Sequence, residues 1–107
     1  MNKIEFIQIN ITTSSKEEAQ KLSKLLLSQK LAACFQIIGP MTSNYWWEDK
    51  IESDEEWLCQ IKTLKINFNQ IEQVIIENHS YDVPEIIVFP ITNGSKNYLD
   101  WVKGICE

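Results

Sequence analysis

The sequence predicts a single α+β domain over residues 1–107, in which two helices cover one face of an antiparallel β-sheet. Three observations indicate this architecture. The length suits one compact domain, and a hydrophobic content of 44% is enough for a core without disulfides or a structural metal. Apolar residues alternate with a period of two in some segments and recur with a helical period in others. These segments follow the order β-α-β-β-α-β, with a short helix at the end.

The first half begins with a strand and a helix. Residues 4–13 alternate, with isoleucine at every second position from 7 to 11, which is typical of a strand with one apolar face. Residues 15–18 match a capping box, so a helix is expected from there to about Gln29. The core stripe of this helix consists of Ala19, Leu22, Leu25 and Leu26.

A long hairpin is predicted next. Residues 31–47 are expected to form a long strand, broken or bulged near Gly39-Pro40, and a turn at 48–50 leads to a second strand at about 51–63. A strand of ~15 residues spans ~50 Å, well beyond the ~17–20 Å of an ordinary sheet strand. The outer part of this hairpin carries Tyr45, Trp46 and Trp47, with Trp57 on the return strand.

The second half repeats the first in outline. A helix is expected over about 66–78 and a strand over 85–91, and after the Asn93-Gly94 turn Ser95 caps a short helix. The two halves match weakly when Ala19 is aligned with Phe68. A doubled split βαβ unit is the ferredoxin-like arrangement, in which both helices cross the same face of one sheet.

Two features predict self-association. Adjacent aromatic side chains on an uncovered ribbon are an aggregation hazard unless a partner buries them. The sheet face opposite the helices also needs a cover, and no residues remain to form a second helical layer. A homotrimer interface including Tyr45, Trp46, Trp47 and Trp57 answers both problems. The alternative is that these aromatic side chains fold back on their own subunit.

Charge and cysteine content exclude several classes of protein. The net charge is −5, with ten lysines and no arginine, so nucleic acid is not an expected partner. No apolar run approaches the ~20 residues of a membrane span, and residues 1–5 do not begin a signal peptide, so a cytoplasmic location is expected. Cys34, Cys59 and Cys106 lack C-x-x-C spacing, which argues against a zinc ribbon or a disulfide framework. Cys34 and Cys59 are expected to be free, largely buried thiols.

One short segment concentrates polar chemistry. His79, the only histidine, is followed closely by Tyr81, Asp82 and Glu85, and an imidazole with nearby carboxylates can ligate a borderline metal. Pro84 makes the segment a rigid entry to the next strand. The alternative is a polar loop that only leads into that strand.

Several motifs in this chain resemble the CutA family of divalent-cation-tolerance proteins, over about residues 5–105. The resemblance implies a ferredoxin-like fold and a tight homotrimer, in which sheets pack around the threefold axis and long hairpins extend into neighbouring subunits. It also implies a role in tolerance to divalent metals, with copper binding described for some members. The motifs are Leu31-Ala32-Ala33-Cys34, Thr42-Ser43-x-Tyr45-x-Trp47, Lys50-Ile51-Glu52, Lys62-Thr63, His79-x-Tyr81-x-x-Pro84-Glu85 and Tyr98-Leu99-x-Trp101.

The chain departs from the family pattern at four positions. Metal binding in such members is associated with a first-strand cysteine and a pair of histidines, which here read Ile11 and Asn78-His79. A copper site built from those ligands would keep only His79. Ser80 stands where a proline is usual, and Asp49 where the hairpin turn often has glycine.

We expect the metal, Cu²⁺ or another divalent cation, to be held by residues including His79, Cys34 and Glu85. His79 has an alternative role as a cation that caps the helix before it. The alternative for Cys34 is packing alone, because the small pair Ala32-Ala33 lets a helix and a strand approach closely. No organic cofactor is expected. A cleft between subunits, like those of the trimeric nitrogen-signalling proteins, would place Lys62, Tyr81, Glu85 and Asn10 around a small polar or anionic ligand. A structural Lys–Glu pair at the interface is the alternative.

The remaining motifs do not indicate an enzyme. The acidic run at residues 52–56 lacks the spacing of an EF-hand and is typical of a solvated hairpin shoulder. The sequence contains no G-x-S-x-G, Walker loop or H-E-x-x-H motif. We therefore expect a cytoplasmic metal-binding protein of cation tolerance, and the alternative is a trimeric sensor or scaffold for a small ligand.

Overall fold

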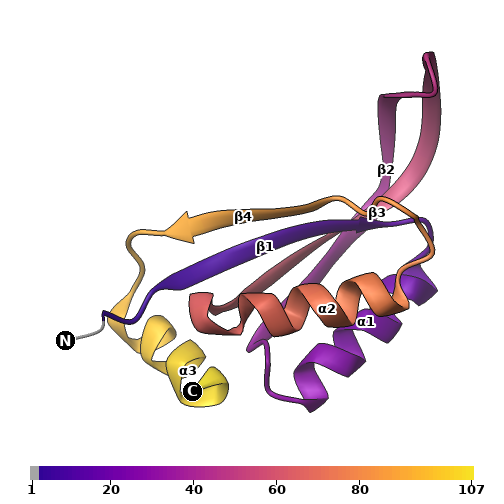
Figure 1. The fold of residues 1–107 in the computed structure, drawn as a ribbon. Coiled ribbons are helices and arrows are strands. Elements are labelled where there is room, and N and C mark those ends of the chain that lie inside the picture. The colour runs from indigo at the N-terminus through magenta and orange to yellow at the C-terminus, as the bar shows by residue number, and fades with distance from the viewer. Residues whose placement is uncertain (1–2) are drawn as a thin grey trace.

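An antiparallel sheet of four strands organises the part of the chain that the computed structural model describes, residues 3–107; Met1 and Asn2 lie outside it. The strand order is β2-β3-β1-β4, and the long strands β2 and β3 form the predicted hairpin (Figure 1). The α+β class and the order of elements are as the sequence predicts. The elements are β1 (Phe6–Thr13), α1 (Lys16–Ser28), β2 (Cys34–Trp47), β3 (Lys50–Leu64), the 3-10 turn η1 (Lys65–Asn67), α2 (Phe68–Asn78), β4 (Ile86–Ile91) and α3 (Lys96–Cys106).

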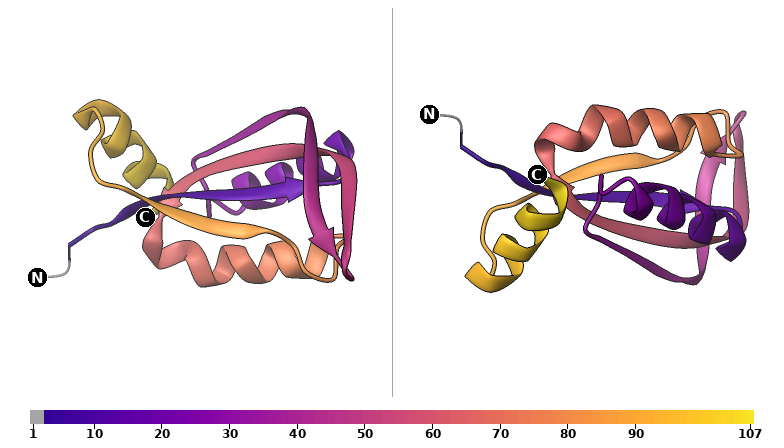
Figure 2. Two further views of the ribbon diagram at one scale, coloured as in Figure 1. Left: turned by 90° about the horizontal axis from the view of Figure 1, so that it is seen from above. Right: turned by 90° about the horizontal axis from the view of Figure 1, so that it is seen from below.

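Helices α1 and α2 lie on the same side of the sheet, as expected, and α3 lies at the end where β1 begins (Figures 1 and 2). Within residues 3–107, no helix covers the opposite sheet face. No helix in this range is both long enough and apolar enough to cross a membrane.

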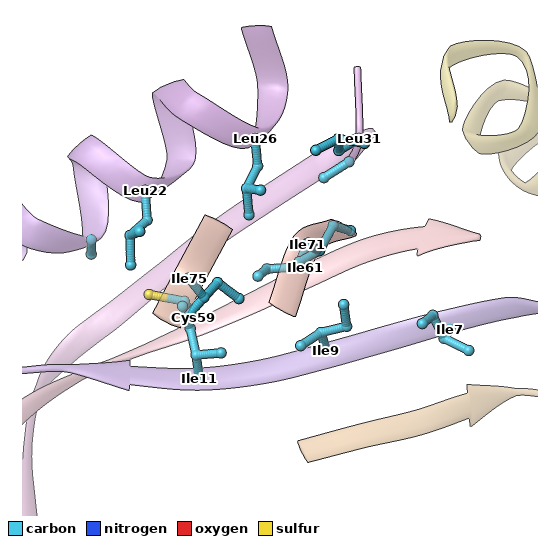
Figure 3. Close-up of a cluster of buried hydrophobic side chains, with 12 residues drawn as sticks. Ile7, Ile9, Ile11, Leu22, Leu26, Leu31, Cys59, Ile61, Ile71 and Ile75 are labelled. Carbon is cyan, nitrogen blue, oxygen red and sulfur yellow. The ribbon is translucent and has the colours of Figure 1, made fainter. Parts of the chain in front are cut away.

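The core lies between these two helices and the sheet (Figure 3). The isoleucines at positions 7, 9 and 11 of β1 point inward, because alternate side chains of a strand face the same side. They meet Leu22 and Leu26 of α1 and Ile71 and Ile75 of α2, all fully buried. Burial of each such side chain contributes about 1.5–3 kcal/mol. Leu25, expected in the same stripe, is only partly buried.

The predicted N-caps are present, but the capping box is only half formed. The hydroxyls of Ser15 and Ser95 accept hydrogen bonds from the backbone N–H groups of Glu18 and Tyr98, at 3.1 and 3.4 Å. The carboxylate of Glu18 does not return to Ser15, as a capping box requires, but accepts the N–H of Ser80 at 3.1 Å. Glu18 therefore links α1 to the segment that follows α2.

The hairpin is irregular where the sequence suggests it. Its register shifts between Ile38 and Met41, around the Gly39-Pro40 pair, and its outer half rises away from the rest of the sheet (Figure 1). At the tip, Glu48 and Asp49 both take left-handed φ angles, 50° and 63°, which a tight two-residue hairpin turn requires. The molecule measures 48 Å in its longest dimension.

Trp57 differs from the other hairpin aromatics, because it packs within its own protomer. It is half-buried, and a Cβ atom added at Gly39 would lie only 2.5 Å from its ring. Tyr45, Trp46 and Trp47 are all exposed. Folding back on the same subunit, the alternative considered above, thus applies to Trp57 and not to these three in the protomer.

Cys59 makes the core sensitive to alkaline pH. Burial, aided by the charge of Glu18, raises the pKa of its thiol to about 12, whereas an unfolded thiol titrates near pH ~8.5. A raised folded-state pKa means that the stabilisation is complete below pH ~8.5 and is lost as pH rises towards the folded value. We expect the melting temperature to fall between these two values, and the fall to be smaller in Cys59→Val, measured by circular dichroism. An identical fall in both proteins would contradict this assignment.

Candidate functional site

A cleft of about 780 Å³ lies between the outer hairpin and the segment that leads from α2 into β4. The hairpin contributes residues 42–45, Trp47 and Glu56 to its wall. The opposite wall consists of residues 80–83 and Glu85, with Thr12 of β1 between them. The cleft thus gathers most of the polar segment that the sequence singles out.

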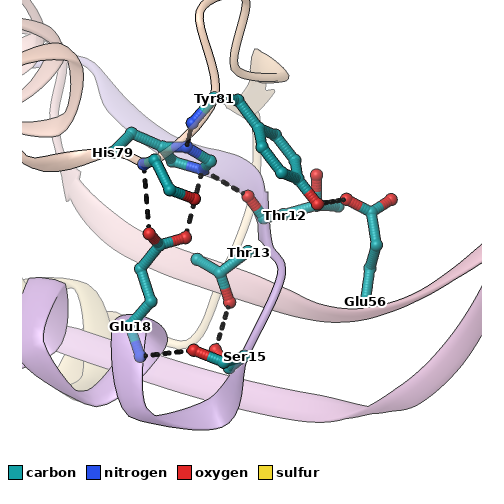
Figure 4. A network of polar contacts seen from close by, with 8 residues as sticks. Thr12, Thr13, Ser15, Glu18, Glu56, His79 and Tyr81 are labelled. Carbon is teal, nitrogen blue, oxygen red and sulfur yellow. Dashed lines mark hydrogen bonds and ion pairs between the residues drawn. The ribbon is translucent and has the colours of Figure 1, made fainter.

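His79 anchors one wall of this cleft (Figure 4). Its side chain is completely buried, and its Nδ1 accepts the backbone N–H of Tyr81 at 3.0 Å. Because Nδ1 is an acceptor, the ring proton sits on Nε2, which donates to the carbonyl of Thr12 at 2.6 Å. The Glu18 carboxylate lies 3.9 Å from Nε2. The ring therefore ties the end of α2 to β1 and to the following segment.

This arrangement corrects the expected roles of His79. A cation that caps α2 would need both ring nitrogens protonated, and Nδ1 could then not accept the N–H of Tyr81. A metal ligand would need a free ring nitrogen, and in this protomer both are hydrogen-bonded. His79 is a hydrogen-bonded structural link beside the cleft.

Both tyrosines that line the cleft are paired with a carboxylate; Glu56 also lines the cleft, and Asp54 does not. The hydroxyl of Tyr81 donates to Glu56 at 2.9 Å, and the hydroxyl of Tyr45 donates to Asp54. Burial and the Glu56 hydrogen bond raise the pKa of Tyr81 well above its usual range, and the Asp54 hydrogen bond raises that of Tyr45 to about 12. Both phenols therefore remain neutral hydrogen-bond donors at physiological pH.

Glu56 is a site residue that the sequence reasoning missed. It closes an acidic run that we expect to be solvated, yet only 7% of its surface is exposed. No local signal marked it, because the alternation of β3 places Glu56 with Gln60 and Lys62, on the face opposite the buried Cys59 and Ile61. The prediction of a solvated shoulder holds for the other residues of the run, which are exposed.

Lys62 and Asn10 do not line this cleft of the protomer, and their place in a cleft between subunits stays a prediction. Both lie on the sheet face that carries no helix, where the amine of Lys62 donates to Gln36 and the amide of Asn10 accepts from Gln8 at 2.9 Å. Lys62 is six residues beyond Glu56 on β3, which corresponds to roughly 20 Å. Tyr81 and Glu85 do line the cleft.

The expected metal ligands are likewise not brought together in one protomer. Cys34 pairs in register with Lys62 and lies beside Tyr98 of α3, whereas His79 contacts Thr12 at the other end of the sheet. Glu85 is exposed in the cleft. Among residues 3–107, no three histidine, cysteine or acidic side chains are close enough to hold a metal ion. The three cysteines are free, and Cys34 is half-buried where deeper burial is expected.

Comparisons with known proteins place this chain in a family. The family profile described as "CutA1 divalent ion tolerance protein" matches residues 7–104. The divalent-cation tolerance protein CutA of Archaeoglobus fulgidus is 43% identical over 99 residues, which cover 92% of this chain and 96% of that protein.

Plant relatives are similar in sequence and in structure. The chloroplastic protein CutA 1 of Oryza sativa is 40% identical over 97 residues, which cover 91% of this chain but 55% of that protein. The chain thus spans about half the length of this curated relative. A crystal structure of CutA1 from Oryza sativa superposes with a TM-score of 0.94 at 38% identity, and the match covers 97% of this chain and 95% of that one. The chain belongs to the CutA1 divalent ion tolerance protein family.

Proposed function

We propose that this protein binds a divalent, copper-like cation and acts in cation tolerance and metal homeostasis in the cytoplasm, without catalysing a reaction. Membership of the CutA1 family over residues 7–104 carries the proposal. The family description names ion tolerance and no reaction. The acidic lining of the cleft supports a positively charged ligand.

The proposed assembly is a homotrimer of ferredoxin-like subunits. The strand order β2-β3-β1-β4, with α1 and α2 on one face, supports the ferredoxin-like description. The sheet face without helices and the exposed outer hairpin support the trimer, since apolar side chains on both would otherwise face water. In the proposed trimer, the open sheet faces pack around the threefold axis and each hairpin reaches a neighbouring copy.

The trimer also bears on where a metal would bind. Because one protomer does not bring His79, Cys34 and Glu85 together, a metal site would take ligands from more than one copy. Glu85 is the predicted ligand that is exposed in the cleft, and Asp82 lines the same wall. Carboxylates at a boundary between copies would supply oxygen ligands there.

Two measurements test this proposal. Light scattering should give the mass of three chains, unchanged by one equivalent of Cu²⁺ or by EDTA. Calorimetric titration should detect Cu²⁺ or Zn²⁺ binding below millimolar concentration, weakened in Glu85→Gln and unchanged in Glu17→Gln, an exposed carboxylate of α1. A monomeric mass would overturn the trimer, and failure of both ions to bind would overturn the metal function.

A second candidate function is supported by the size of the cleft. A volume of about 780 Å³ lies in the range of small-molecule sites, and Tyr45, Trp47 and Tyr81 add aromatic surface to the wall. A trimeric sensor or scaffold would bind a small ligand there, with metal incidental. Stabilisation by a small molecule in a thermal-shift screen, in metal-free buffer, would favour this candidate.

A further inference from the structure

The cleft has an unbalanced charge. Its charged lining residues are Glu56, Asp82 and Glu85, and no lysine lines it in the part of the chain that the structure describes. The expected ammonium, Lys62, lies on the open sheet face instead. A ligand that enters this cleft therefore meets carboxylates without a fixed counter-charge, which disfavours an anion.

Glu56 adds a second, independent observation. This carboxylate is 93% buried and lines the cleft, but its hydrogen bond comes from a neutral phenol, Tyr81, and it forms no ion pair with any residue from 3 to 107. A buried carboxylate is costly unless a positive partner compensates it. Glu56 is therefore hydrogen-bonded but carries no ion pair within the described residues of the protomer, and a cation in the cleft would compensate its charge.

The residues that line the cleft favour an organic ammonium group over a metal ion. A metal ion needs several ligands converging on one point, and no such group of three exists among the described residues. Three aromatic side chains, Tyr45, Trp47 and Tyr81, lie along the cleft with the carboxylates. Aromatic faces attract organic ammonium groups and make apolar contacts with methylene chains. A hydrated metal ion gains little from either interaction.

We propose that the cleft binds an elongated aliphatic polyamine. One ammonium group would compensate Glu56, a second would reach Asp82 or Glu85, and the methylene chain between them would lie against Trp47 and the tyrosines. This inference rests on the second candidate function, a small ligand in this cleft, and names its chemical class.

The proposed trimer leaves room for such a ligand. Neighbouring residues of a strand point to opposite faces, so Trp46 points away from the side of Tyr45 and Trp47. Trp46 and its cross-strand partner Ile51 do not line the cleft. A neighbouring copy can pack on the Trp46 face of the hairpin. The other face carries Tyr45 and Glu56 and continues into the open sheet face, so in the proposed trimer the polyamine lies where that face meets a neighbouring copy.

Calorimetric titration of the whole metal-free protein with spermidine tests the proposal. The matched pair of variants is Glu56→Gln and Glu55→Gln, which remove the same charge at adjacent positions, one buried in the cleft and one exposed outside it. Glutamine at position 56 can still accept the Tyr81 hydroxyl, so both variants should fold, as circular dichroism would verify. We expect about a tenfold or greater loss of spermidine affinity in Glu56→Gln and less than about a twofold loss in Glu55→Gln.

Three results would overturn the proposal: no spermidine binding at millimolar concentration, equal weakening in both variants, or full displacement by MgCl₂ at matched ionic strength. If spermidine fails while another small molecule stabilises the protein in the thermal-shift screen, the polyamine class is wrong and the ligand-binding cleft stands. The Cu²⁺ titration is read separately, so failure of the metal function is distinguishable from both.

Discussion

Replacing His79 with alanine is expected to lower the free energy of unfolding by about 2–4 kcal/mol. The substitution removes the partners of two backbone groups, the carbonyl of Thr12 and the N–H of Tyr81. A buried polar group left without a partner costs about 1–3 kcal/mol, and the lost ring also leaves a cavity. Urea unfolding, followed by circular dichroism, measures the change.

Ser80→Ala is the matched control, because Ser80 is the exposed neighbour and keeps its backbone bond to Glu18 after the substitution. We expect the control to lie within about 0.5 kcal/mol of the parent. A similarly small change in His79→Ala would show that the histidine network contributes little to stability. Binding of Cu²⁺ to His79→Gln at the affinity of the parent would agree with a structural role for this ring.

The second large effect concerns assembly. The double substitution Trp46→Ser with Ile51→Ser is expected to reduce the mass in solution from three chains to one. The two side chains face each other across the hairpin and are 71% and 67% exposed in the protomer. Large aromatic anchors dominate the energy of interfaces, with about 2–4 kcal/mol or more lost on truncation of a central one. In a trimer, that loss is repeated at each contact.

Light scattering over a range of protein concentrations measures this effect. Ile76→Ser is the control, because Ile76 is an exposed isoleucine of α2, on the helical side of the molecule. The control should keep the mass of three chains. If the double variant also keeps that mass, the outer hairpin is not the interface. Trp57→Ala should act mainly on folding, because Trp57 packs against Gly39 of its own chain.

Local patterns predicted the secondary structure well. The alternating isoleucines of residues 7–11 indicated β1 and its buried face, and Ser15 and Ser95 marked the starts of two helices. These signals work because periodicity and capping depend on neighbours in sequence. The predicted break at Gly39-Pro40 matches the shift in register for the same reason.

The site was predictable only in part, because it depends on contacts between distant segments. The sequence placed Tyr81, Glu85 and Lys62 in a cleft between subunits, and of these Tyr81 and Glu85 line the cleft of the protomer whereas Lys62 does not. Position along β3 determines which end of the sheet a residue occupies, and that position depends on register with β1. The structural role of His79 depends on the carbonyl of Thr12, 67 positions away in the chain, and no local pattern reveals such a contact.

The central position of β1 has a consequence for folding during synthesis. Within residues 3–107 this strand is synthesised before both of its pairing partners, since Phe6 pairs with Leu64 on one side and with Ile91 on the other. Until those residues leave the ribosome, the apolar face of β1 has no sheet to complete and both its edges are open. Such non-local pairing slows folding and exposes nascent chains to aggregation. The sheet therefore cannot be completed around β1 until the residues of β4 have emerged.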